Sequence, residues 1–239
     1  MDSLIFDIEK SRETSRLFSW GWEMIIDHTH SAYIKKWERI GAGRYNGAYY
    51  YSKEIVENII PNVETTRNWI TVNVQGFGVN HAIVFIHNNV KPSNYDWLKR
   101  YDDLILVCGI KETVPKVEHL GRAVYLPLSI DTEYVKQFSV EEKTKGTAFI
   151  GRKSKLQYGS VPGGVDIISG LPREELLKVM AEYRNVYAVG RTAIEARCLN
   201  CRIKSYDKRY PDTRRWRVID NRDAARMLQR ELNKIDGRK

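Results

Sequence analysis

The chain has 239 residues, of which 42% are hydrophobic and 29% charged, and its formal net charge is +9. This composition excludes a disordered chain and is sufficient for one large domain or two small α/β lobes. The sequence contains no apolar run of about 18 residues and no signal-peptide pattern at its start. We therefore expect a cytoplasmic protein without a transmembrane segment.

Positive charge is concentrated in the second half of the chain. Residues 1–146 carry 18 Lys/Arg and 19 Asp/Glu, whereas residues 147–239 carry 21 and 11. A basic lobe attracts phosphate-bearing ligands, which include a nucleotide diphosphate, a nucleic acid and an anionic membrane. Charge alone does not choose among these three.

Short apolar runs rich in β-branched residues alternate with helix-like segments, a pattern typical of parallel strands joined by crossover helices. The predicted fold class is α/β, with two Rossmann-like lobes that each contain a parallel sheet. Strands are expected at 69–74, 82–87, 104–108, 123–126, 147–150, 165–168, 186–189 and 202–206. The polar run 139–146 is the predicted linker, so residues 1–145 form the first lobe and residues 146–218 the second.

Three helices are expected in the second half. Residues 172–184 begin with a proline and two acidic residues, which favour a helix N-terminus, and a second helix should run from 191 to about 199. Residues 219–239 form a separate basic amphipathic helix in this prediction.

The loop 41–47 has glycines spaced GxGxxxG, which is one residue longer than the dinucleotide fingerprint. A nicotinamide or flavin site is therefore poorly supported. The loop could instead line a cleft, and the nearby Tyr45, Tyr49, Tyr50 and Tyr51 could stack on a sugar or a base.

The cysteines do not point to a metal. Cys198 and Cys201 form a CxxC pair, but a zinc site needs about two more ligands and no histidine follows His119. We interpret the pair as structural and predict neither a metal site nor a cofactor.

The segment 186–203 carries the most specific pattern: a strand, a glycine turn, a helix that starts with small and hydroxyl residues, and another strand. A helix N-terminus directly after a glycine turn presents backbone N–H groups and a positive dipole end, which suit a diphosphate. Glu195 should remain near this turn, where its carboxylate could accept the two hydroxyls of a ribose.

This segment resembles the nucleotide-sugar-binding half of GT-B glycosyltransferases. Two further runs resemble the same family in the same order, namely 124–138, at the end of the first lobe, and 147–155, the first strand of the donor lobe with its basic loop. The resemblance covers about 120–206. It implies a donor site that includes Gly151, Arg152, Lys153, Gly190, Arg191, Thr192 and Glu195, with Lys155 as a further candidate.

One position departs from the family pattern. Retaining members with a Glu-x7-Glu motif carry a glutamate where this chain has Tyr187. An inverting reaction is therefore favoured, and it requires a base from the first lobe. His87 follows an apolar strand and is the leading candidate, with Asp7, Glu64 and His81 as alternatives.

The resemblance implies a glycosyltransferase that uses a nucleotide-diphosphate sugar, such as a UDP-sugar, without a metal. The acceptor could be a modified base in DNA, as in phage enzymes, or an envelope glycan or lipid. The alternative is a noncatalytic nucleic-acid-binding or nucleotide-binding α/β protein.

Overall fold

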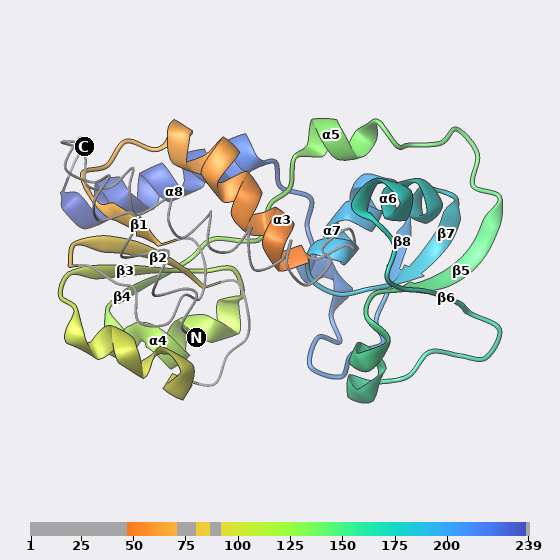
Figure 1. Ribbon diagram of the computed structural model, residues 1–239, viewed down its shortest axis with the longest axis horizontal. Coiled ribbons are helices and arrows are strands. Elements are labelled where there is room, and N and C mark those ends of the chain that lie inside the picture. The colour runs from red at the N-terminus through yellow and green to blue at the C-terminus, as the bar shows by residue number, and fades with distance from the viewer. Residues whose placement is uncertain (1–46, 71–79, 87–91, 238–239) are drawn as a thin grey trace, which may run out of the picture. The chain divides into compact units, whose positions relative to one another are not determined.

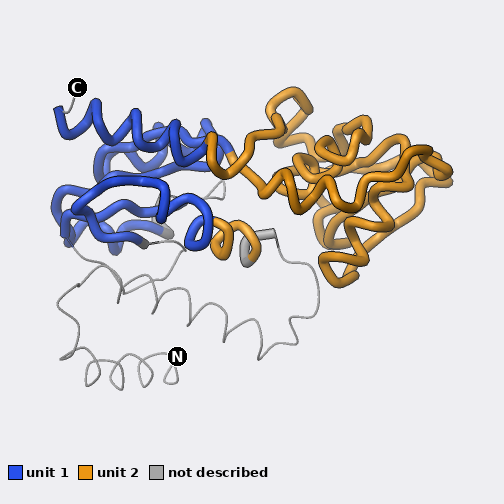
Figure 2. Tube along the Cα trace, turned by 90° about the horizontal axis from the view of Figure 1, so that it is seen from above, with its two compact units in different colours: residues 1–40, 55–127, 224–239 blue, residues 41–54, 128–223 orange. Residues whose placement is uncertain are grey.

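The computed structural model describes residues 47–70, 80–86 and 92–237, which form two compact units (Figure 2). The described residues 55–127 and 224–237 belong to unit 1, and residues 47–54 and 128–223 belong to unit 2. The units thus divide at Pro127, whereas the sequence places the boundary at 145, and most of the C-terminal helix groups with unit 1. In the described ranges, no helix has the length and apolar character needed to span a bilayer.

Unit 1 contains a four-stranded parallel sheet in the order β1-β2-β3-β4 (Figure 1). Its strands are β1 (Asn68–Ile70), β2 (Ala82–Ile86), β3 (Leu104–Cys108) and β4 (Arg122–Tyr125). Each predicted strand of the first lobe is present, although the predicted extensions of β1 to 74 and of β2 to His87 lie outside the described residues.

The two central strands of this sheet are buried along their whole length. Every residue of AIVFI in β2 and of LILVC in β3 is buried. Continuous apolar runs of this kind are typical of parallel strands that are covered on both faces. Figure 1 shows helices α8 (Asn221–Asp236) and α4 (Val114–Val117) on opposite faces of the sheet.

Helix α8 contributes its apolar face to this core. Ala224, Ala225, Leu228 and Leu232 are all at most 1% exposed. The helix end is held by Asp236, which accepts a hydrogen bond of 3.0 Å from Arg67 Nη2. Burial of this apolar stripe explains why the helix groups with the first sheet and does not stand apart.

The other helical segments of the first half are short. The chain enters the described region through α3 (Gly47–Glu54), which continues directly into a π-helical turn. The remaining segments are η2 (Ile55–Ile59), η3 (Ile60–Asn62), η4 (Pro92–Arg100), η5 (Lys111–Thr113) and η6 (Glu118–Leu120).

Unit 2 contains the second parallel sheet, in the order β6-β5-β7-β8. Its strands are β5 (Lys145–Ile150), β6 (Asp166–Ile168), β7 (Tyr183–Tyr187) and β8 (Arg202–Lys204). Its helical segments are α5 (Thr132–Lys136), η7 (Lys153–Tyr158), α6 (Arg173–Ala181), α7 (Arg191–Cys198) and η8 (Thr213–Arg215). The prediction of an α/β fold with two parallel sheets is confirmed.

Candidate functional site

The sheet of unit 2 changes direction next to β5. Strands β6 and β7 pair with opposite sides of β5, so the connections after β5 and β7 leave the sheet in different directions. Phe149 is in register with Tyr187, and the residues that follow each strand therefore emerge at the same edge. Ligands of open α/β sheets bind at this kind of switch point, beyond the carboxyl ends of the strands.

The connection after β5 is a basic loop that is fixed at both ends. At its start, the Gly151 N–H donates to Ile168 O at 3.1 Å. At its far end, a Cβ on Gly159 would lie 1.5 Å from the backbone oxygen of Tyr206, so only glycine permits this close approach. Arg152 and Lys153 lie between these points and are exposed.

Lys155, in the same loop, lies among other cations. Burial lowers the pKa of Lys155, and the charges of Arg209 and Arg152 lower it further, with partial compensation by Asp207. The direction of this shift is the expected response of an ammonium group to an excess of positive charge. The loop after β5 therefore favours an anion.

The connection after β7 is the glycine turn that begins α7. Gly190 has φ 64° and ψ −141°, a conformation that residues with a side chain rarely adopt, and its carbonyl accepts from the N–H groups of Ala193 and Ile194. Because glycine has no side chain, the N-cap of α7 makes no side-chain hydrogen bond. The first turn, which includes Thr192, keeps the positive end of its dipole directed beyond the edge of the sheet.

Replacement of Gly190 by Ala should lower the free energy of unfolding by about 1–3 kcal/mol, because the new residue would be held at a strained backbone conformation. Among the described residues, no heavy atom lies within 4 Å of the added Cβ, so steric overlap does not contribute. Gly163 has the same open surroundings without a positive φ and is the matched control. Urea denaturation should show almost no change for Gly163→Ala, and equal losses for both variants would contradict the strain.

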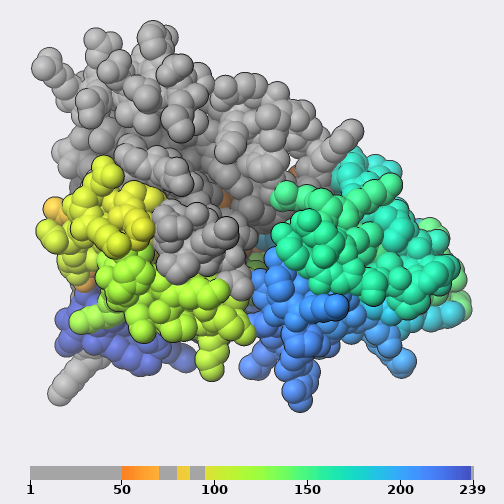
Figure 3. Space-filling view, turned by 90° about the horizontal axis from the view of Figure 1, so that it is seen from below, coloured from red at the N-terminus to blue at the C-terminus, as the bar shows by residue number. Residues whose placement is uncertain are grey.

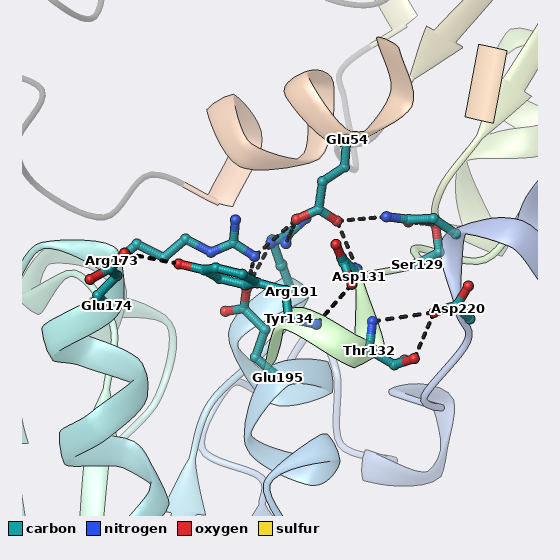
Figure 4. Close-up of polar contacts among 11 residues, drawn as sticks. Glu54, Ser129, Asp131, Thr132, Tyr134, Arg173, Glu174, Arg191, Glu195 and Asp220 are labelled. Carbon is teal, nitrogen blue, oxygen red and sulfur yellow. Dashed lines mark hydrogen bonds and ion pairs between the residues drawn. The ribbon is translucent and has the colours of Figure 1, made fainter. Parts of the chain in front are cut away.

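Four charged residues form a buried cluster at the start of α7 (Figure 4). Arg173 Nη2 lies 2.9 Å from Glu54 Oε1, and Arg191 Nη2 also donates to this oxygen. Arg191 Nε donates to Glu195 Oε1 at 2.9 Å. Two guanidinium groups and two carboxylates thus balance one another in a region from which water is largely excluded.

Glu54 is the centre of this cluster. Its second oxygen, Oε2, accepts from the Asp131 N–H at 3.0 Å and from Asn221 Nδ2 at 2.9 Å. Burial raises the pKa of Glu54, but the charge and hydrogen bond of Arg191, together with Arg173 and Asn221, outweigh this effect, so the pKa is lowered overall. The carboxylate is therefore held in its ionised form.

The aromatic rings of two tyrosines complete the surroundings of Arg173. Its guanidinium carbon lies 4.5 Å from the ring centre of Tyr50 and 4.7 Å from that of Tyr134. Such contacts hold a cation in place without neutralising it. Of the tyrosines expected to stack on a sugar or base, Tyr50 instead contacts this guanidinium, and Tyr51 is 3% exposed.

The cluster corrects the sequence prediction for Glu195. This residue was expected to face a ribose and not the core, but it is 0% exposed and its Oε1 accepts from Arg191. Arg191 is itself 6% exposed, and its side chain is directed toward Glu54 and Glu195. Neither side chain is directed outward to a ligand, so any contribution of this turn to phosphate binding must come from its backbone and dipole.

Sequence reasoning missed Glu54, Arg173 and Asn221, which are essential to the cluster. Nothing in their local sequence distinguishes them from surface residues at helix ends. They come from α3, α6 and the start of α8, and only the tertiary fold brings them together.

The residues proposed as the base have different positions. His87 and Asp7 lie outside the described residues. His81 precedes β2, where its Nδ1 lies 2.6 Å from Asp103 Oδ2, so it is at the amino edge of the first sheet and not at the expected carboxyl edge. Glu64 is exposed, and its backbone N–H donates to Gln229 Oε1 at 2.6 Å.

The three cysteines are reduced and buried, and burial raises the pKa of each thiol. Lys143 Nζ donates to the carbonyls of Ala181 and Leu199 and lies 3.5 Å from Cys201 Sγ. In the described part of the chain, no group of three or more His, Cys, Asp or Glu residues is arranged to hold a metal ion. The CxxC pair packs in the core, as a structural role requires.

The sequence matches no family model, and comparisons with curated proteins and with solved structures found no match. Function is therefore inferred from the geometry and charge of the site.

Proposed function

We propose that this chain is a glycosyltransferase that binds the diphosphate of a nucleotide-sugar donor at the carboxyl edge of the sheet in unit 2. The observation that carries the proposal is the switch point between β5 and β7. It brings the basic loop after Ile150 and the glycine turn at Gly190 to one edge of the sheet, and both are elements that bind phosphate in other α/β proteins.

The two loops supply complementary interactions. Arg152 and Lys153 are exposed cations that can donate to phosphate oxygens, and the first turn of α7 contributes backbone N–H groups and its dipole. Glycosyl transfer leaves negative charge on the departing diphosphate. Fixed cations at this place would stabilise that charge in the transition state without a metal ion.

The buried cluster has a supporting role in this proposal. Arg191 is the first residue of α7, and its ion pairs to Glu54 and Glu195 fix the direction in which the helix starts. A rigid helix start is needed because the dipole acts within about one turn of the terminus. Transfer also requires a base on the acceptor side, for which His87 remains our candidate. The three reduced thiols favour a cytoplasmic enzyme.

Isothermal calorimetry with UDP tests the donor site. We expect binding that is unchanged by a chelator, because Arg152 and Lys153 take the place of a divalent cation. Replacement of Arg152 by Ala should weaken binding by about 1.5–3 kcal/mol, the usual contribution of a hydrogen bond to a charged group.

Arg184→Ala is the matched control, because Arg184 is an exposed arginine of β7 outside the two loops. It should leave the dissociation constant unchanged. Binding that disappears with the chelator, or equal losses in both variants, would exclude the proposed diphosphate site.

A further inference from the structure

Cations and aromatic rings alternate along one part of unit 2. Arg209 lies 3.4 Å from the ring centre of Tyr158 and 5.5 Å from that of Tyr210, and Arg215 lies 5.0 Å from the ring centre of Tyr210. Arg215 also lies 5.3 Å from the ring of Trp216, and Lys155 lies 5.7 Å from that of Tyr158. We call this set the cation–aromatic ladder: Lys155, Tyr158, Arg209, Tyr210, Arg215 and Trp216.

The ladder joins two segments that are distant in the sequence, 151–159 and 206–217. Gly159 forms an antiparallel bridge with Asp207, and the Lys208 N–H donates to Tyr158 O at 3.1 Å. Figure 3 shows the segment after β5 and the segment after β8 meeting on one face of unit 2. The backbone contacts hold the ladder as one surface.

This surface carries a large excess of positive charge. The two segments contain eight Lys or Arg residues and two acidic residues. Asp207 is fully buried and pairs with Arg209 at 2.6 Å, and Asp212 pairs with Arg214 at 3.0 Å. Each acid thus offsets one cation, and the remaining charge is available to attract a polyanion.

Stacking on a ring orients an arginine without cancelling its charge. The ring contacts the face of the guanidinium, and the N–H donors at the edge remain directed outward in the plane, where they match phosphate oxygens. A row of such groups can contact successive phosphates. Tyr158, with 36% of its surface exposed, adds a ring on which a base can stack.

A membrane surface would require a different composition. Proteins that bind lipid bilayers combine basic residues with exposed apolar side chains that insert among the acyl chains. Here Tyr210 and Trp216 are 8% and 4% exposed, and the large hydrophobic residues exposed nearby are Tyr158 and Val218. The surface offers phosphate contacts and little insertion.

We propose that this surface of unit 2 binds a polynucleotide through its phosphates. The inference goes beyond the proposed function and does not require it, because nucleic-acid binding is measured without a nucleotide sugar. If both hold, the acceptor is a nucleic acid.

The test is fluorescence anisotropy with a labelled 20-nucleotide single strand and with the duplex of the same sequence, at several salt concentrations and without nucleotide. If four phosphates are contacted, the logarithm of the association constant should fall with the logarithm of salt with a slope of about −3 for the single strand and about −4 for the duplex. Absence of binding to both at low salt overturns the proposal.

The variant for this test is Lys208→Glu combined with Arg215→Glu, which alters the surface and leaves Arg152 and Lys153 of the diphosphate site intact. It should weaken binding by about tenfold or more and make the salt slope shallower by about one. The control is Lys178→Glu combined with Arg184→Glu, which makes the same charge change at exposed positions of α6 and β7. Equal weakening in the two double variants would mean that net charge alone is responsible, and it would overturn the proposal.

A neutral version, Lys208→Gln with Arg215→Gln, covers the case in which charge reversal disturbs folding, as judged by thermal melting. It should give a smaller loss in the same direction, and no loss would count against the surface. Sedimentation with phosphatidylglycerol vesicles is the parallel measurement, and binding to vesicles but not to oligonucleotides would overturn the proposal. Failure of the UDP titration bears on the proposed function alone.

Discussion

Replacing Glu54 with Gln is expected to lower the free energy of unfolding by about 3–5 kcal/mol, the usual cost of breaking a buried ion pair by removing one partner. The substitution keeps the size of the side chain but removes the charge that faces Arg173 and Arg191, which are 8% and 6% exposed. Two guanidinium groups would then share the single carboxylate of Glu195. Equilibrium urea denaturation measures the loss.

Glu133→Gln is the control for this experiment. Glu133 forms an ion pair of 3.5 Å with Arg222, but its side chain is 74% exposed. Exposed pairs contribute about 0–1 kcal/mol, so its removal should change stability little. Similar losses in the two variants would show that burial does not strengthen the Glu54 cluster.

The same cluster predicts a pH dependence with a definite sign. The pKa of Glu54 is lowered in the folded protein from its ordinary value of 4.5. Its contribution to stability is therefore fully present above pH 4.5 and is lost as the pH falls through the lowered pKa, because the unfolded state takes up the proton first. The difference in stability between the wild type and Glu54→Gln should shrink below pH 4.5.

Replacement of Phe149 by Ala should destabilise the protein by about 3–5 kcal/mol, the range for aromatic truncations that leave a cavity in a core. Phe149 is 0% exposed in β5, and its ring packs edge-on against Tyr206 with centroids 5.0 Å apart. A Cβ added at Gly151 would lie 3.4 Å from the same ring. The side chain thus supports both the loop after β5 and the segment after β8.

Phe149→Leu serves as a graded control, because it preserves most of the apolar volume and should cost less than half as much in urea denaturation. If the two loops depend on this ring, Phe149→Ala should also weaken binding of UDP and of the oligonucleotide at temperatures where the protein remains folded. A large loss of stability with both affinities unchanged would contradict this structural dependence.

The sequence by itself determined the elements and their class. The continuous apolar runs at 82–86 and 104–108 could only be buried strands, because their length and β-branched content suit a parallel sheet covered on both faces. The glycine before Arg191 and the small residues after it likewise predicted a turn and a helix start, which α7 shows. These are local properties, and the residues that set them are neighbours in the chain.

The order of the strands, the partners of the buried charges and the grouping of α8 were decided by the tertiary structure alone. Periodicity predicts a strand but not its neighbour, so the position of β5 between β6 and β7, which creates the switch point, could not be inferred. Glu195 was expected to face a ligand because it is polar and near a helix start. Arg191, Arg173 and Glu54 make its burial favourable, and two of these come from other helices. A charged side chain is stable in a core only when its counter-ions are present, and their arrival there depends on the packing of segments that are far apart in sequence.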